Sequence, residues 1–124
     1  MSELINVLHT IQIELGSDFV AACIITPGGE ILEKLCEMPS RPNKISKAHL
    51  AAVVKLMDGL QTSLKAGPVE EILVTVAHGY ILITSLIGNA GYLGLAVRRK
   101  EALDLAKLLA KEFAGELASL ITPE

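Results

Sequence analysis

The sequence has few aromatic residues, no tryptophan and no excess of positive charge. Aromatic residues make up 3% of its 124 residues, the net charge is −3, and 98–100 (Arg-Arg-Lys) is the only basic cluster. Nucleic-acid binding usually needs a basic face and often rings on which bases stack. We therefore expect no nucleic-acid partner.

Long apolar runs are also missing, although 51% of the residues are hydrophobic. No run approaches the roughly 18 residues of a membrane span, so we expect no direct membrane insertion. The start, MSELINVLHTIQIELG, lacks the basic segment and cleavage site of a signal peptide. The only cysteines, Cys23 and Cys36, lie too far apart for a C-x-x-C motif and suggest buried, reduced thiols of a cytoplasmic protein. The apolar excess is most simply explained by a buried oligomer interface.

The remaining pattern predicts one α+β domain over residues 1–124, in the order α-β-β-α-β-β-β-α. Apolar positions at helical spacing predict helices at 3–15, 47–66 and 100–121. Runs rich in Val, Ile and Leu predict strands at 18–26, 30–38, 69–76, 80–87 and 92–98. Short links favour antiparallel pairing of the first two strands and of the last three. The sheet is apolar enough on both sides to need helices on both faces.

The pair Gly28-Gly29 raises the possibility of a phosphate-binding loop. Such a loop needs a Lys and a Ser or Thr that open a helix, whereas here Glu30 and a second strand follow. A phosphate would be repelled by the Glu30 carboxylate. We therefore interpret the segment as a hairpin turn, in which glycine tolerates positive φ.

No other motif indicates a catalytic, metal or cofactor site. The histidines fall in no metal-ligand motif, and no G-x-S-x-G nucleophile elbow is present. Glu70 and Glu71 are neighbours in a strand and so point to opposite faces, where they cannot share a substrate. We expect a protein that is not an enzyme and has no cofactor.

The predicted middle helix carries two apolar strips. One strip, which includes Leu50, Val53 and Met57, would cover the sheet. Beside it lies a strip of small or apolar residues, Ala48, Ala52, Leu56, Gly59 and Ser63. Exposed helix faces usually carry charged residues, so this second strip favours a self-association seam over deeper burial in the same domain.

The predicted strand 69–76 would lie at a sheet edge, because the last three strands form a meander. Its apolar residues are not interrupted by Pro or Lys, which makes it prone to pair with another strand unless something covers it. Pairing with its own copy across a two-fold axis would cover it. The predicted dimer interface therefore combines the seam of the middle helix with Ile72, Leu73 and Val74. Ile13 lies outside the apolar stripe of the first helix, where we expect it to meet a partner.

Two stretches, FVAACIITPGGEILEKL and EEILVTVAHGYILITSLIGNAGYLGLAVRR, resemble the Roadblock family, which is named partly for a dynein light chain. The resemblance implies a Roadblock/longin-like, profilin-like fold. This fold is a five-stranded antiparallel sheet with the middle helix on one face and the two terminal helices on the other. Members dimerise through the middle helix and the third strand.

The long last helix makes the chain more similar to the prokaryotic and scaffold-type members, which regulate or anchor small Ras-like GTPases. Their GTPase contacts lie largely on the paired middle helices. Carried over, the resemblance implies these partner-binding residues: His49, Lys55, Asp58, Gln61, Thr62 and Lys65. The expected function is that of a non-enzymatic homodimeric regulator or scaffold of such a GTPase. One alternative is a small-ligand sensor with a pocket around Tyr80, Tyr92 and Cys23; another is a structural subunit of a motor or membrane-tethered complex.

Overall fold

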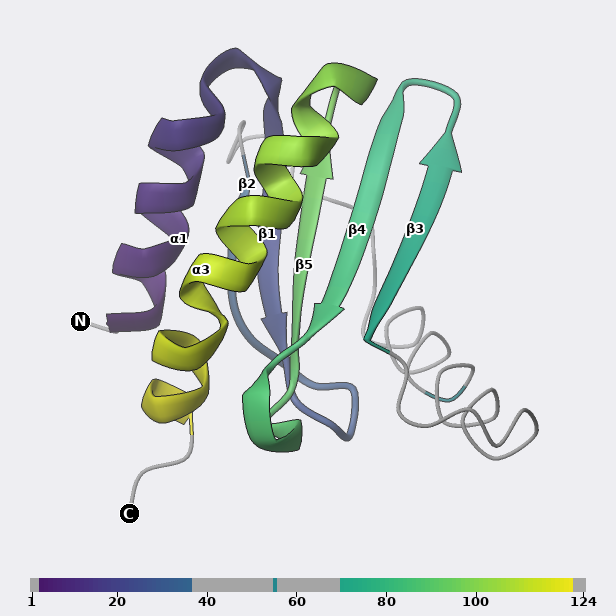
Figure 1. Cartoon of the computed structure of the whole chain (residues 1–124). Coiled ribbons are helices and arrows are strands. Elements are labelled where there is room, and N and C mark those ends of the chain that lie inside the picture. The colour runs from purple at the N-terminus through teal and green to yellow at the C-terminus, as the bar shows by residue number, and fades with distance from the viewer. Residues whose placement is uncertain (1–2, 37–54, 56–69, 122–124) are drawn as a thin grey trace.

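The computed structural model describes residues 3–36, 55 and 70–121 of the chain (Figure 1). Within these residues the strands form one five-stranded antiparallel sheet in the order β2-β1-β5-β4-β3. Its strands are β1 (Phe19–Ile25), β2 (Ile31–Cys36), β3 (Glu71–Val76), β4 (Gly79–Ser85) and β5 (Tyr92–Val97). The helices are α1 (Glu3–Leu15) and α3 (Leu103–Ile121), with short 3-10 turns at Gly16–Asp18, Ile87–Asn89 and Lys100–Ala102.

Both described helices lie on the same face of the sheet, as Figure 1 shows. Their apolar stripes pack against inward-facing residues of the central strands, and the fully buried side chains include Leu8, Ile11, Leu95 and Leu117. Phe19, at the start of β1, is 1% exposed in the same cluster. The predicted α+β class, antiparallel pairing and common face of the terminal helices are confirmed. The predicted middle helix at 47–66 lies outside the described residues, apart from Lys55.

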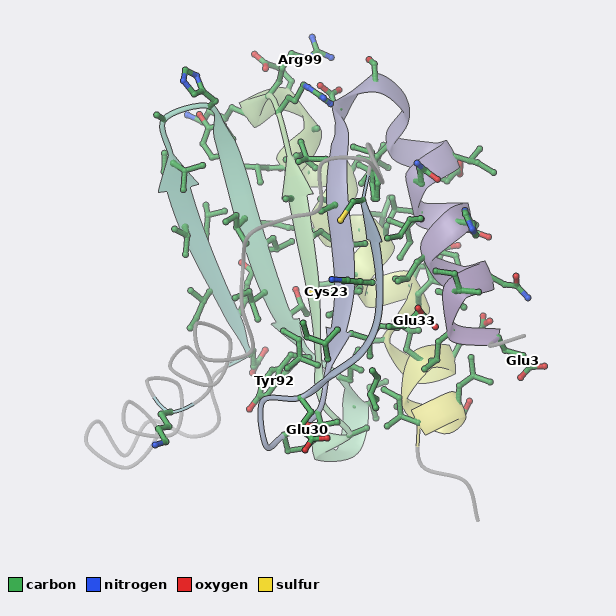
Figure 2. The ribbon with its side chains drawn as sticks, turned by 180° about the vertical axis from the view of Figure 1, so that it is seen from behind. Glu3, Cys23, Glu30, Glu33, Tyr92 and Arg99 are labelled. Carbon is green, nitrogen blue, oxygen red and sulfur yellow. The ribbon has the colours of Figure 1, made fainter. Side chains whose placement is uncertain are left out.

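The opposite face of the sheet is also apolar (Figure 2). Side chains alternate along each strand, so residues between the core positions point away from α1 and α3. The register pairs Cys23 with Gly94 and Ile25 with Tyr92, and a second cluster forms around the buried Ile25. We call this side the open face, because neither α1 nor α3 lies on it.

The segment from Thr26 to Glu30 is a hairpin turn, as predicted. The Thr26 N–H donates to the Glu30 carbonyl at 2.8 Å, and the Gly29 N–H donates to the Thr26 carbonyl at 2.9 Å. Gly29 has a φ of 94°, which only glycine adopts readily. The loop returns the chain directly into β2 and opens no helix N-terminus for a phosphate.

The basic cluster at 98–100 has a structural role. The Arg98 guanidinium donates to the carbonyls of Ser17 and Phe19, at 2.9 Å each. The Arg99 guanidinium binds both carboxylate oxygens of Asp18, at 2.8 and 2.9 Å, and holds the pKa of Asp18 below its usual value. These contacts join the end of β5 to the start of β1, so two of the three basic residues stabilise the fold.

Candidate interaction surface

The β3 strand is an exposed apolar edge. It pairs with β4 on one side, and the order of the strands leaves its other side at the end of the sheet within the described part of the chain. Leu73 is 44%, Val74 39% and Val76 45% exposed, while Ile72 is half-buried. Ile72, Leu73 and Val74, which the sequence predicts to lie in a dimer interface, are consecutive residues of this edge strand.

The exposed apolar side chains of β3 point to both faces of the sheet. Val74 pairs with Ile81 and points to the open face, whereas Leu73 pairs with Leu82 and points to the side of α1 and α3. Figure 1 shows that neither helix reaches over β3, so Leu73 stays accessible on that side. A surface ion pair of 3.6 Å joins Lys107 Nζ of α3 to the Glu71 carboxylate at the start of β3. The exposed apolar residues of β3 come after Glu71 in the strand.

The open face next to β3 is hollowed into an apolar groove of about 200 Å³. Its floor includes Cys23, Ile81, Ile83 and Gly94, and Lys34 lies among its lining residues. A Cβ at Gly94 would lie 3.0 Å from the Cys23 sulfur, so the glycine makes room for the thiol. The neighbour that a larger residue at Gly94 would meet is thus a side chain of β1. Edge and groove together form one continuous apolar surface.

Cys23 is a free, partly buried thiol that lines this groove. Burial raises its pKa to about 11, since desolvation disfavours the thiolate. Cys36 also lines the groove, and both cysteines are free and partly buried. The groove is therefore better suited to apolar contacts than to reactions of a thiolate.

The pocket predicted around Tyr80, Tyr92 and Cys23 is wrong in one respect. The lining residues of the groove include Cys23 and Tyr80 but not Tyr92, although the Tyr80 ring itself is directed to the other face. The Tyr80 ring packs against the core on the helix side, while Tyr92 packs with Ile25 on the open face. The two rings lie on opposite faces because they occupy register positions of opposite parity, so they cannot enclose one ligand.

The candidates for chemistry lie apart from one another. Among residues 3–36, 55 and 70–121, no three His, Cys, Asp or Glu side chains lie close enough together to hold a metal ion. His9 contacts Gln12 on α1, and His78 lies in the turn between β3 and β4. Glu71 is engaged by Lys107, and Glu70 precedes the strand. In the same part of the chain, neither helix has the length and apolar character needed to cross a bilayer.

Most predicted residues of the middle helix fall outside the described part of the chain. The interface residues in this position are Ala48, Ala52, Leu56, Gly59 and Ser63. The partner-binding residues in this position are His49, Asp58, Gln61, Thr62 and Lys65. Lys55 is described, and it is helical and exposed.

Three features of the surface could not be read from local sequence. These are the Lys107–Glu71 ion pair, the anchoring of Asp18 by Arg99, and a groove between α1 and α3. Each joins residues that are distant in the chain. Ile13, which the sequence predicts to meet a partner, is 77% exposed on α1 but does not line this groove.

No family model matches the sequence, and no curated protein matches it. Solved structures do resemble it. The gliding protein MglB from Thermus thermophilus superposes with a TM-score of 0.77 at 18% identity, over 94% of this chain and 87% of that one. A structure of MglB with tetrameric arrangement gives 0.78 at 20% identity, over 94% and 86%. A Roadblock/LC7 domain from Streptomyces avermitilis gives 0.57 at 15% identity, over 82% and 88%.

These likenesses establish the fold. The chain has the Roadblock fold, as the pattern of apolar strands and glycine turns predicted.

Proposed function

We propose that the chain is a Roadblock-family regulator or scaffold of a small Ras-like GTPase, that it works as a cytoplasmic homodimer, and that it is not an enzyme. The observation that carries the proposal is the exposed apolar edge at β3 on a Roadblock fold. The similarity to the structure of a gliding protein supports a role in a regulated assembly. A protein of this kind would bind no nucleotide itself, because the nucleotide belongs to the partner.

The homodimer would form by antiparallel pairing of β3 with the β3 of a second copy. Such pairing would satisfy the unpaired backbone groups of the edge and bury Val74 and its neighbours in both subunits. The small-residue strip of 47–66 would pack beside the joined strands. A related structure with a tetrameric arrangement supports self-association in proteins of this fold.

The GTPase would bind on the paired 47–66 segments, with Lys55 among the contacting residues. Lys55 is exposed, as a partner-binding residue must be before it binds. A two-fold platform of this kind can act by preferring one nucleotide state of the partner. A binder shifts the equilibrium between two states only through a difference in its affinity for them.

The test is capture of the GTPase from extract of the native host, loaded either with a non-hydrolysable GTP analogue or with GDP. We expect mass spectrometry to find a small GTPase enriched on the immobilised chain in one of the two states. Lys55→Glu should reduce the capture severalfold, whereas Lys111→Glu, the same charge change at an exposed position of α3, should not.

Two results would count against this proposal. Capture of no GTPase in either state would contradict the function as a whole. Equal capture in both states would contradict state selection and leave only anchoring.

A second candidate function, a small-ligand sensor, is favoured by the apolar groove of the open face. An apolar cavity with a few polar groups is a common form of ligand site. Native mass spectrometry of the purified protein would detect a small molecule that stays bound. A mass equal to that of the bare chain or its dimer would exclude a tightly retained ligand.

A further inference from the structure

The helical side of the molecule carries a second hollow, separate from the open face and from β3. It lies between α1 and α3 and has a volume of about 270 Å³. Its lining combines the apolar Val7, Phe113 and Leu120 with polar residues of α1, Asn6 and Thr10, and with the carboxylates of Glu3 and Glu116. Figure 2 shows Glu3 at the start of α1.

The two carboxylates of the groove are not neutralised within the described residues. Neither Glu3 nor Glu116 takes part in any of the ion pairs found there. The helix α1 contains no Lys or Arg at all. On α3, Lys107 is engaged by Glu71, which leaves Lys111 as the one basic residue of that helix not used in this way. The helical face therefore has unpaired negative charge at a hollow whose lining is partly polar and partly apolar.

Large apolar side chains are also exposed on these two helices. Ile13 of α1 is 77% exposed, and on α3 Leu108 is 61% and Leu105 38% exposed. These positions lie off the stripes that pack into the core, so burial against the sheet does not explain them. An apolar surface with a charged border is typical of a site that binds another protein.

The sign of the charge decides which occupant fits. A second copy of this chain would bring Glu3, Glu116 and their neighbours against the same acidic groups, and like charges at an interface oppose association. An anionic lipid surface would be repelled for the same reason. A partner segment with basic residues beside apolar ones would complement both properties of the groove.

We propose that the groove between α1 and α3 is a docking site for a basic amphipathic helix of a partner protein. Apolar side chains of the partner, spaced at three and four residues, would enter between Val7, Phe113 and Leu120. Lysines or arginines on its flanks would pair with Glu3 and Glu116. This site lies on the other side of the sheet from the open face, and its residues include none of those proposed to contact the GTPase.

The probe is a fluorescent peptide of about 18 residues, built of Leu at helical spacing with Lys elsewhere. A control peptide replaces every Lys with Glu. Fluorescence anisotropy should show binding of the Lys peptide to the full chain and none of the Glu peptide. No binding of the Lys peptide would overturn the proposal.

The matched variants separate a docking site from general attraction between opposite charges. The double variant Glu3→Arg/Glu116→Arg should weaken binding roughly tenfold, since two ion pairs become repulsive. Asp104→Arg/Glu112→Arg makes the same change of net charge on α3 outside the groove and should alter binding less than about twofold. Equal weakening by both double variants would overturn the proposal.

The location is checked independently by NMR on the labelled protein. Shifts induced by the Lys peptide should centre on Val7, Phe113 and Leu120. Shifts that centre instead on β3 or the open face would contradict docking on the helical side. Circular dichroism and sedimentation of each variant confirm that it keeps its fold and its assembly.

Discussion

The two edge strands of the sheet, β2 and β3, differ in how well they are protected against pairing with another strand. In β2, Glu33 and Lys34 lie side by side in the middle of the strand, and Leu32 is its one exposed large apolar residue. In β3, the segment from Ile72 to Val76 contains no charged residue, and three of its large apolar side chains are exposed. Charges on an edge strand are a common way to prevent association. The contrast supports the proposal that the β2 edge is protected against pairing and that the β3 edge pairs with a partner.

The difference also bears on the form of assembly. Pairing through both edges would join copies without limit, whereas pairing through one edge across a two-fold axis closes on itself as a dimer. A β-bulge between Ile24 and Ile25 further disturbs the β1–β2 ladder near the protected edge. The β3 edge is thus suited to the proposed dimerisation, whereas the charged β2 edge disfavours the open-ended association that would produce a fibre.

The largest expected effect comes from a mutation in the buried core, outside both edge strands. Phe19→Ala deletes a ring that is 1% exposed between the sheet and the helices. It should lower the free energy of unfolding by about 3–5 kcal/mol, as large cavities in cores do. Urea denaturation followed by circular dichroism measures this loss. A cost below about 1 kcal/mol would contradict the central place of Phe19 in the core.

The next effect should separate the two edges. Val74→Lys places a charge on β3, while Leu32→Lys places the same charge on β2 at a similar exposed fraction, 39% against 41%. In the proposed dimer, the β3 variant should weaken association by about 2 kcal/mol or more, because the change would occur in both subunits at the contact between the two β3 strands. The β2 variant should leave the dimer intact. Sedimentation velocity over a dilution series measures both, and equal behaviour of the two variants would contradict the distinction.

A smaller effect concerns the centre of the open face, between the two edges. Because the pKa of Cys23 is raised to about 11, its thiolate is scarce at neutral pH. At about pH 8 its alkylation should be roughly a hundredfold slower than in the denatured chain, and it should accelerate as the pH rises towards 11. Peptide-resolved mass spectrometry after iodoacetamide treatment measures the rate. Labelling as fast as in the denatured chain would show that the groove does not shield the thiol.

The smallest effect concerns the ion pair between Arg99 and Asp18, which joins the central strands β5 and β1 and involves neither edge strand. Arg99 lowers the pKa of Asp18 in the folded state, so the pair stabilises the protein above the ordinary carboxyl pKa of about 3.9. This contribution is lost as the pH falls through the lower folded-state value. Asp18→Asn should slightly lower the melting temperature at neutral pH and converge with the wild type in acid. Differential scanning calorimetry tests this, with Glu14→Gln as the control, and an undiminished gap in acid would refute the assignment.

The sequence predicted the elements that depend on local pattern. The alternation of Ile72, Val74 and Val76, together with the short links around β4, was enough to place β3 at an edge. The turn at Gly29 followed from its composition, because few other residues tolerate its φ. These features could be predicted because each of them depends only on residues that are close together in the sequence.

Features that join distant segments could not be predicted in this way. The role of Arg99 became visible only once the β1–β5 pairing brought Asp18 beside it. The opposite faces of Tyr80 and Tyr92 follow from the strand register, which the sequence did not specify. The hollow between α1 and α3 depends on how the two helices pack, and neither Glu3 nor Glu116 has a motif that would identify it.

Hydrogen exchange at the two edges tests the central claim most directly. In the native protein at concentrations above those at which it dissociates, we expect the amides of β3 to be protected nearly as well as those of β4. The amides of β2 should include a rapidly exchanging set, since half of an edge strand's backbone groups face solvent. On dilution, protection of β3 should fall to the level of β2. Equal exchange of β2 and β3 at every concentration would contradict pairing through β3.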